Sequence, residues 1–291
     1  KLVEIADKNK LVIETCAEQI DLQEIGIKHG SCIDKGMIEK IIGCKLRGEK
    51  DKNQRQECGC LESIEVGTYN TCKNGCKYCY APDCMRRDRQ EFYNKQSARV
   101  DILKKIQQDC KVLSGIKERV LLCFTCDPYQ KLDDTEQLTR ETLKLFRQYQ
   151  IPFQILTKAG SRAERDFDLY SETDAFAATL TFMDEEKSLY YEPEAALPAE
   201  RIETIKKAKQ AGIETWVSFE PVLNDDEIFK LLEATHEYVD LYKVGKISRF
   251  QPDKEIDWER FAYEIVSRLE ALGKKYYIKN DLKKHLNLKA V

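Results

Sequence analysis

The stretch Asn70-Thr71-Cys72-Lys73-Asn74-Gly75-Cys76-Lys77-Tyr78-Cys79-Tyr80 decides the fold and the chemistry of this chain. Its three cysteines have the spacing Cys-x3-Cys-x2-Cys and follow directly on a β-rich run, Ser63–Tyr69. Thiolates are the preferred ligands of iron–sulfur clusters, so three on one short loop can hold three irons of a cubane. The fourth iron then stays open, as a reactive cluster requires. Cys84 lies five residues further on; with it as fourth ligand the site would be an electron carrier or a zinc site.

From Leu61 onward, β-rich runs alternate with amphipathic helical runs. We expect strands at Ser63–Tyr69, Arg119–Phe124, Phe153–Thr157, Ala175–Thr181, Thr215–Phe219 and Tyr238–Val244. We expect helices at Ser97–Leu113, Thr135–Tyr149, Arg162–Leu169, Ala199–Ala211, Asp225–Ala234 and Trp258–Leu272. A helix after each strand predicts a parallel α/β architecture. Six repeats are too few for an eightfold barrel, so we predict an open, partial (β/α)6 barrel of TIM type, with its chemistry at the carboxyl ends of the strands.

The first sixty residues differ from the rest in cysteine content and in pattern. Five cysteines lie among short apolar segments that glycines interrupt, which predicts a compact, irregular layer with a short helix near Lys35–Ile42. We therefore divide the chain into a cysteine-rich segment, residues 1–60, and a barrel, residues 61–291. Four thiolates could hold a second iron–sulfur cluster or a zinc ion, and buried free thiols are the alternative. The best ligand set is Cys16, Cys32, Cys58 and Cys60, with Cys44 as a substitute.

Composition restricts the class of protein and its surroundings. The 291 residues are 42% hydrophobic and 34% charged, which favours a globular, soluble chain over a disordered one. No apolar run approaches the roughly 18 residues that span a bilayer, and the first ten residues lack the apolar core of a signal peptide. Twelve cysteines in short spacings then favour metal binding in a reducing cytoplasm over disulfides. The net charge of −3 argues against binding of nucleic acid by the chain as a whole.

In this context the cysteine loop resembles the radical S-adenosylmethionine (SAM) superfamily, over about residues 61–250. An aromatic residue, Tyr78, precedes the third cysteine, as in that family. The resemblance implies that Cys72, Cys76 and Cys79 hold a [4Fe–4S] cluster and that SAM chelates its open iron. One-electron reduction would cleave SAM to methionine and a 5′-deoxyadenosyl radical, which abstracts hydrogen from a substrate. It also implies anaerobic chemistry and a reductant such as flavodoxin or ferredoxin.

Three further stretches are similar to the spore photoproduct lyase branch of the superfamily. The first is Tyr78-Cys79-Tyr80, because tyrosines beside the last cluster cysteine take part in radical return in the lyase. This makes Tyr78 and Tyr80 candidate catalytic residues. In the alternative interpretation, Tyr78 packs over the adenine of SAM and Tyr80 packs in the core.

The second stretch, Phe124–Tyr129, matches a Thr-Asp-Pro-Tyr type of motif, with Thr125 and Asp127 as candidate cofactor-binding residues. The chain departs from the lyase here, because Phe124 stands where the lyase has its hydrogen-donating cysteine. Cys123 and Cys126 lie on either side as candidate catalytic thiols, and strand alternation would point them to opposite faces. Cys126 is preferred because it is nearer the catalytic end; a buried, inert thiol is the alternative.

The third stretch is Leu156-Thr157-Lys158 with the strand that contains Thr179. In lyase-like proteins the matching lysine and small hydroxyl residue contact the methionyl part of SAM, and an ammonium group suits a carboxylate. Arg165-Asp166 resembles a pair on the next helix of these relatives. Ser218 and Glu220 would face the mouth of the barrel and could bind substrate or the SAM ribose; ordinary polar strand ends are the alternative.

Residues 12–82 are also similar to an uncharacterised bacterial family with a like cysteine-rich segment, through stretches such as Cys58-Gly59-Cys60. We therefore expect a radical SAM enzyme that acts on an unidentified substrate. A peptide or small molecule is favoured over damaged DNA, given the acidic charge balance. The alternatives are a non-enzymatic iron–sulfur protein for electron transfer or redox sensing, and a zinc-stabilised interaction module.

Overall fold

The computed structural model describes residues 1–16, 18–43, 45–46, 48–51, 56–62, 66–247, 250–251 and 255–286. The chain divides into two compact units, Lys1–Glu65 and Val66–Val291. Cys44 and the first three residues of the predicted strand Ser63–Tyr69 lie outside the described residues. Among the described residues, no helix is both long and apolar enough to cross a membrane.

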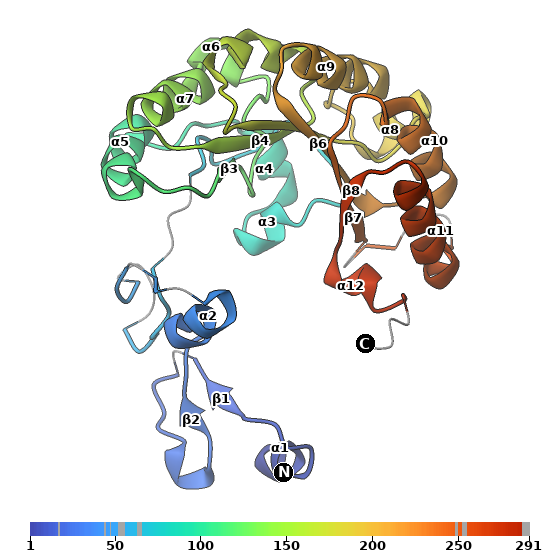
Figure 1. The fold of residues 1–291 in the computed structure, drawn as a ribbon. Coiled ribbons are helices and arrows are strands. Elements are labelled where there is room, and N and C mark those ends of the chain that lie inside the picture. Colours follow the sequence, from blue (N-terminus) through green and yellow to red (C-terminus); the bar gives the residue numbers. More distant parts are fainter. Residues whose placement is uncertain are drawn as a thin grey trace. The chain divides into compact units, whose positions relative to one another are not determined.

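The larger unit is built on a parallel sheet of six strands (Figure 1). In spatial order these are β3 (Val120–Leu122), β4 (Phe153–Thr157), β5 (Ala175–Thr179), β6 (Glu214–Val222), β7 (Leu241–Lys246) and β8 (Lys275–Ile278). Every strand pairs in parallel with its neighbour in sequence, so all the carboxyl ends meet at one edge. This confirms the α/β class and the partial-barrel architecture.

One of the six predicted strands is wrong, and the sixth strand of the sheet comes from the other end of the chain. The described part of the predicted first strand, residues 66–69, makes only an isolated antiparallel bridge between Tyr69 and Ala98. The cysteine loop therefore follows an extended segment and not a sheet strand. The sixth strand of the sheet is instead β8, which pairs with β7.

The helices that connect the strands lie on the outer side of the sheet (Figure 1). They are α6 (Asp133–Glu136), α7 (Leu138–Gln148), η2 (Gly160–Leu169, a 3₁₀ helix), α8 (Glu185–Tyr191), α9 (Pro198–Gln210), α10 (Asp225–Thr235) and α11 (Trp258–Ala271). Helix α5 (Ile102–Leu113) precedes β3, and α12 (Asn280–Lys283) follows β8. Two short helices, α3 (Ala81–Cys84) and α4 (Arg89–Asn94), follow the cysteine loop. The predicted helix Thr135–Tyr149 is broken in two, because Gln137 adopts a left-handed conformation with φ of 49°.

The two faces of the sheet carry different side chains. Outward-facing residues such as Ile155, Phe176 and Phe219 pack with the helices in the main core. The inner face has a smaller cluster of Ala175, Ala177 and Trp216, against which Leu121, Leu156 and Leu241 pack. Since side chains alternate along a strand, the inner face continues toward the carboxyl ends through the residues two positions further on. These are Lys158, Thr179, Ser218 and Lys243, followed by Glu220.

The smaller unit contains α1 (Leu2–Lys8), β1 (Glu14–Thr15), η1 (Gln23–Ile25), β2 (Lys28–His29) and α2 (Lys35–Ile42). The strands β1 and β2 pair in parallel. Helix α2 has the predicted bounds, because the Asp34 carboxylate accepts a hydrogen bond from Met37 N–H at its start and Gly43 ends it with φ of 72°.

Candidate functional site

The cysteine loop is held in place from three sides. Thr71 O accepts a hydrogen bond from Gln130 Nε2 at 2.7 Å, which ties the start of the loop to the segment after β3. Tyr93 on α4 donates to Cys76 O at 3.0 Å, and Arg89 Nη2 to Cys79 O at 2.9 Å. These bonds engage three carbonyl groups of the loop and so restrain its backbone.

Gly75 is required at the tip of this loop. Its φ is +66°, a region that side chains disfavour. A Cβ there would also lie 3.1 Å from Cγ of Pro193, a residue that follows α8. Behind it, Glu194 N–H donates to Asn74 O at 3.2 Å, so the tip lies against the segment between α8 and α9.

Cys76 is buried, whereas Cys72 and Cys79 are half-buried. Burial raises the pKa of the Cys76 thiol to about 12, and burial together with the nearby Asp127 raises the pKa of Cys72 well above its usual value. The charge of Cys79 raises the pKa of Cys76 further, and the charge of Cys76 raises the pKa of Cys72 further. A site that raises thiol pKa values so far holds thiolates only when a cation compensates their charge, as iron ions do.

A buried ion pair adjoins Cys76. Arg201 on α9 and Glu192 after α8 are 1% and 0% exposed, and Arg201 Nη1 lies 2.6 Å from Glu192 Oε2. Tyr78 donates a short hydrogen bond to the other oxygen of Glu192. Arg201 Nη1 and Nε also donate to the carbonyls of Thr179 and Ala196, at 3.0 and 2.7 Å. The remaining nitrogen, Nη2, is buried without a hydrogen-bond partner.

Opposite charges in this cluster keep Lys158 and Glu192 ionised. Burial acts to lower the pKa of Lys158, but attraction from Cys76 and Glu192 raises it above the ordinary value. Burial acts to raise the pKa of Glu192, but Arg201 and Lys158 lower it overall. Lys158 therefore stays an ammonium and Glu192 a carboxylate, and the charges of Lys158, Arg201 and Glu192 all act on the Cys76 thiol.

Asp127 joins the cysteine loop to two strand ends. Its Oδ2 accepts from Asn74 Nδ2 at 2.9 Å and from the backbone N–H of Lys158 at 2.7 Å. Its Oδ1 accepts from the Tyr129 N–H at 2.9 Å and from Thr157 Oγ1 at 2.6 Å. Both oxygens are thus used within the chain, and the carboxylate, 6% exposed, fixes where Lys158 stands relative to the loop.

Cys123 and Cys126 lie together rather than on opposite faces, so the prediction from strand alternation is wrong. Their sulfurs are 3.1 Å apart, and Cys123 Sγ donates to Cys126 O at 2.9 Å. The reason is that β3 ends at Leu122, after which the chain bends and alternation no longer applies. Contact with Cys123, followed by burial, raises the pKa of Cys126 well above its usual value. Phe124 is 65% exposed.

The other predicted site residues occupy varied surroundings. Thr125 is half-buried, and Thr179 and Ser218 are buried neighbours in the β5–β6 register. Glu220 forms an ion pair with Lys279 at 3.2 Å. Tyr80 is 50% exposed and donates to Phe124 O at 2.9 Å, so it does not pack in the core.

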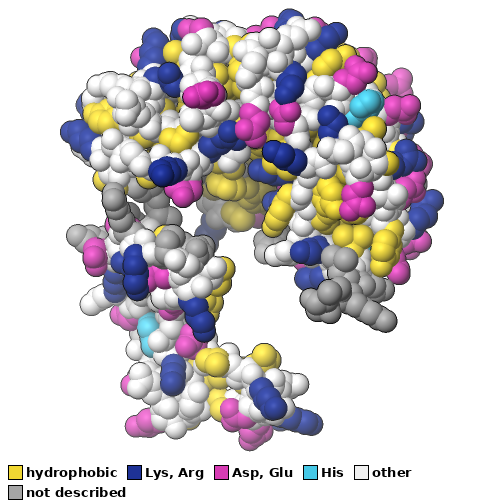
Figure 2. Space-filling view, in the orientation of Figure 1, with side chains coloured by type: hydrophobic (Ala, Val, Ile, Leu, Met, Phe, Trp, Pro, Cys, Tyr) yellow, Lys and Arg dark blue, Asp and Glu magenta, His cyan; other side chains and the backbone are white. Residues whose placement is uncertain are grey.

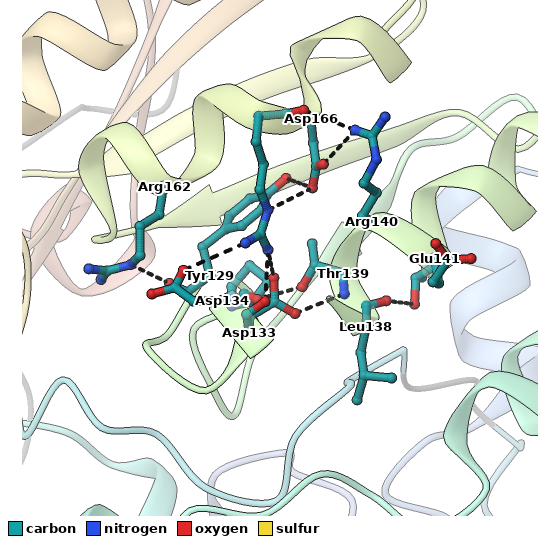
Figure 3. Close-up of polar contacts among 12 residues, drawn as sticks. Tyr129, Asp133, Asp134, Leu138, Thr139, Arg140, Glu141, Arg162 and Asp166 are labelled. Carbon is teal, nitrogen blue, oxygen red and sulfur yellow. Dashed lines mark hydrogen bonds and ion pairs between the residues drawn. The ribbon is translucent and has the colours of Figure 1, made fainter. Parts of the chain in front are cut away.

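Asp166 belongs to a polar network with Tyr129 and Arg140 (Figure 3), and Arg165 lies next to it in the chain. Asp166 accepts from Tyr129 at 2.9 Å and from Arg140 at 2.8 Å. Arg165 pairs with the buried Asp133, which also accepts from Thr139 N–H at 3.0 Å. The network fixes the segment that carries Asp127 and Gln130, and so supports the site from outside it.

Glu192 and Arg201 are functional candidates that the sequence did not indicate. Arg201 carries a detectable signal, because it lies on the buried stripe of α9 with Thr204, Ile205 and Ala208. A charged residue in such a stripe requires a buried partner. Glu192 has no comparable signal.

Comparisons with known proteins identify the family of this chain. The sequence matches the radical SAM superfamily over residues 66–239, so the chain belongs to that superfamily. Residues 1–81 match a domain of unknown function, DUF1848. No curated protein matches the chain.

Solved structures share the fold at low sequence identity. Streptococcus suis SuiB aligns with a TM-score of 0.56 and 13% identity, covering 77% of this chain and 50% of SuiB, so the chain spans half of that relative's length. A spore photoproduct lyase variant aligns with a TM-score of 0.57 and 12% identity, covering 85% of this chain and 94% of the lyase chain. The lyase complexed with dinucleoside spore photoproduct aligns with a TM-score of 0.56 and 13% identity, and the alignment covers 80% of each chain.

The residues of the site fit the cofactors that this family implies. Three thiols on one preformed loop match the donor chemistry of an iron–sulfur cubane. The unpartnered Arg201 Nη2 and the Lys158 ammonium suit a carboxylate such as that of SAM.

Proposed function

We propose that the protein is a radical SAM enzyme in which Cys72, Cys76 and Cys79 bind a [4Fe–4S] cluster. The observation that carries the proposal is a restrained loop with three thiols whose Cys76 is under the influence of two cations. These are the buried Arg201 and the half-buried Lys158. When bound, the cluster and SAM supply a 5′-deoxyadenosyl radical through one-electron reductive cleavage. Flavodoxin or ferredoxin is the expected kind of reductant.

Lys158 and Arg201 are the groups that we assign to the SAM carboxylate. Arg201 is locked by Glu192 and two backbone carbonyls, so only Nη2 remains to bind a ligand. Asp127 and Glu192 are positioning residues, because their oxygens are used to hold these cations and the loop. Thr179 and Ser218 line the same inner face and are assigned to the cofactor or the substrate. Tyr78, which packs with Phe182, Tyr191 and Leu223, forms part of the wall next to the loop.

Cys126 is the proposed hydrogen-atom donor to a substrate radical. A donor must carry its hydrogen, and the contact with Cys123 and the burial that raise the Cys126 pKa keep it a protonated thiol at neutral pH. Donation would leave a thiyl radical on Cys126. The radical could then pass to Cys123, whose sulfur lies 3.1 Å from that of Cys126.

We propose a peptide or a small molecule as the substrate. SuiB has been solved bound to its precursor peptide, SuiA, with a TM-score of 0.54 to this chain, 12% identity and coverage of 84% of this chain and 60% of SuiB. On the side of the barrel unit that Figure 2 shows, basic and acidic side chains are interspersed and no extended basic area is visible. A DNA substrate would favour such an area, because phosphate contacts dominate affinity.

The test is anaerobic turnover of SAM. The protein is reconstituted with iron and sulfide, reduced with dithionite and given SAM, and 5′-deoxyadenosine is quantified by mass spectrometry. The wild type should form it and Cys79→Ala should not. Equal absence from both, with an intact cubane in the wild type and no SAM binding, would contradict the proposal and favour an electron carrier.

A further inference from the structure

The smaller unit brings four cysteine sulfurs together from three separate segments. Cys16 follows β1 directly, Cys32 follows β2, and Cys58 and Cys60 lie on a later loop. Cys16 Sγ is 3.9 Å from Cys58 Sγ and 3.7 Å from Cys60 Sγ. Cys16, Cys32 and Cys60 have sulfurs that all lie within 4.8 Å of one another, and no other such group occurs among the described residues.

The backbone holds these segments together without help from the sulfurs. Leu61 N–H donates to Ile33 O at 2.9 Å, which joins the Cys-Gly-Cys loop to the segment after β2. Gly59 makes this approach possible, because a Cβ there would lie 2.6 Å from Ser31 Oγ. The parallel pairing of β1 with β2 fixes the third segment. These backbone contacts therefore hold the three segments in the arrangement that gathers the sulfurs.

Backbone N–H groups point at the sulfurs. Ile33 N–H donates to Cys60 Sγ at 3.3 Å. The Cys32 N–H is directed at Cys16, and the Cys60 N–H at Cys58. Such donors stabilise negative charge on sulfur and orient it, as the groups around metal-bound thiolates do.

The unit has little apolar core to hold it. Among its described residues, the buried apolar side chains are Ala6, Ile27 and Leu61, and the other two buried residues are Cys58 and Cys60 themselves. A segment of this size with so small a core usually requires a cross-link or a structural metal. The cysteines are the only candidates for one within the described part of the unit.

We propose that Cys16, Cys32, Cys58 and Cys60 bind one tetrahedral zinc ion that stabilises the smaller unit. Thiolates about 2.3 Å from one zinc ion lie about 3.8 Å from one another. The Cys16 sulfur lies 3.7 Å from that of Cys60 and 3.9 Å from that of Cys58, so Cys58 joins the group of Cys16, Cys32 and Cys60 through Cys16. The site is closed by four protein ligands, as structural zinc sites are. This inference concerns residues apart from the cysteine loop and does not depend on the proposed SAM chemistry.

The same distances argue against a second cubane. Cluster cysteines each bind a different iron, so their sulfurs lie about 6 Å apart. The three sulfurs of the Cys72–Cys79 loop do not form a group within 4.8 Å, whereas those of Cys16, Cys32 and Cys60 do, and Cys58 lies 3.9 Å from Cys16. The close spacing of Cys16, Cys32 and Cys60 is therefore that of ligands to a single ion.

The test is the metal content of the full-length protein after anaerobic purification and reconstitution. Two variants separate the sites: the double variant Cys58→Ser/Cys60→Ser, and the triple variant Cys72→Ser/Cys76→Ser/Cys79→Ser. The wild type should contain about one zinc per chain, measured by plasma mass spectrometry. The double variant should lose zinc and keep its iron and sulfide, and the triple variant should do the reverse.

A measurement on the wild type covers the case in which the double variant does not fold. Zinc-edge X-ray absorption should give four sulfur neighbours at about 2.3 Å. A nitrogen or oxygen neighbour, an iron and sulfide content that doubles that of one cubane, or a mass that reveals disulfides among these cysteines would each overturn the proposal. Loss of 5′-deoxyadenosine formation with zinc intact would count against the proposed function and leave the zinc site standing.

Discussion

Replacing Arg201 by methionine removes the partner of a fully buried carboxylate. The Glu192 and Arg201 side chains are 0% and 1% exposed and lie 2.6 Å apart. Methionine keeps much of the apolar length of arginine, so the main loss is the charge. Breaking a buried pair costs about 3–5 kcal/mol of unfolding free energy. Because Lys158 and Tyr78 still face Glu192, we expect the lower end, about 3 kcal/mol.

The penalty should depend on pH in a defined direction. In the wild type, Arg201 and Lys158 outweigh burial and lower the Glu192 pKa, so the stabilisation is present above the ordinary glutamate pKa and is lost as pH falls through the lowered one. Without Arg201, burial raises the Glu192 pKa, and the carboxyl takes up a proton under mildly acidic conditions. The destabilisation by Arg201→Met should therefore be larger at pH 8 than at pH 5.

Urea unfolding of the metal-free protein measures this directly. The two tryptophans, Trp216 and Trp258, both belong to the larger unit, so their fluorescence reports its unfolding alone. The double variant Glu192→Gln/Arg201→Met removes both charges and should recover part of the loss. A penalty below about 1 kcal/mol, as for exposed pairs, or one that is equal at both pH values would refute the reasoning.

Three further outcomes follow from the same contacts. Gly75→Ala should lower the free energy of unfolding by about 1 kcal/mol and lower the iron bound after reconstitution, because Gly75 has a φ of +66° and lies next to Pro193. The control is Gly115→Ala, because Gly115 has a φ of +80° and nothing lies within 4 Å of an added Cβ. This variant should lose a similar amount of stability and bind as much iron as the wild type. Asn74→Ala removes a hydrogen bond to Asp127 and should cost about 1 kcal/mol in urea unfolding; an unaltered iron content would show that this bond does not position the loop. In the cluster-free protein, iodoacetamide at pH 8 should modify the exposed Cys84 well before Cys126, whose pKa is raised; equal rates in peptide mass spectra would contradict a buried, protonated Cys126.

The fold could be predicted where a pattern is local and strong. Phe153–Thr157 alternates between buried and half-buried positions and was predicted with its observed bounds, and α11 was predicted to within one residue. The strand β8 was missed because it is short and its burial alternates only weakly. The break at Gln137 was missed because the backbone conformation there has no sequence signature.

The site could be predicted only where its residues are neighbours in sequence. Cysteine spacing predicts the loop, and the resemblance to lyase-like proteins suggests roles for Lys158 and Thr179 at strand ends. The ion pair of Glu192 with Arg201 joins two separate elements, so only the tertiary structure brings it beside Cys76. The contact between Cys123 and Cys126 likewise depends on a bend that begins where β3 ends.

The central claim, a cluster with an iron open to SAM, is tested most directly by electron paramagnetic resonance of the reduced protein. The spectrum of the wild type is recorded with and without SAM. The account predicts that SAM changes the cluster signal, because the cofactor binds an iron that Cys72, Cys76 and Cys79 leave free. An identical signal in both samples would contradict it and indicate that a fourth protein ligand closes the cluster.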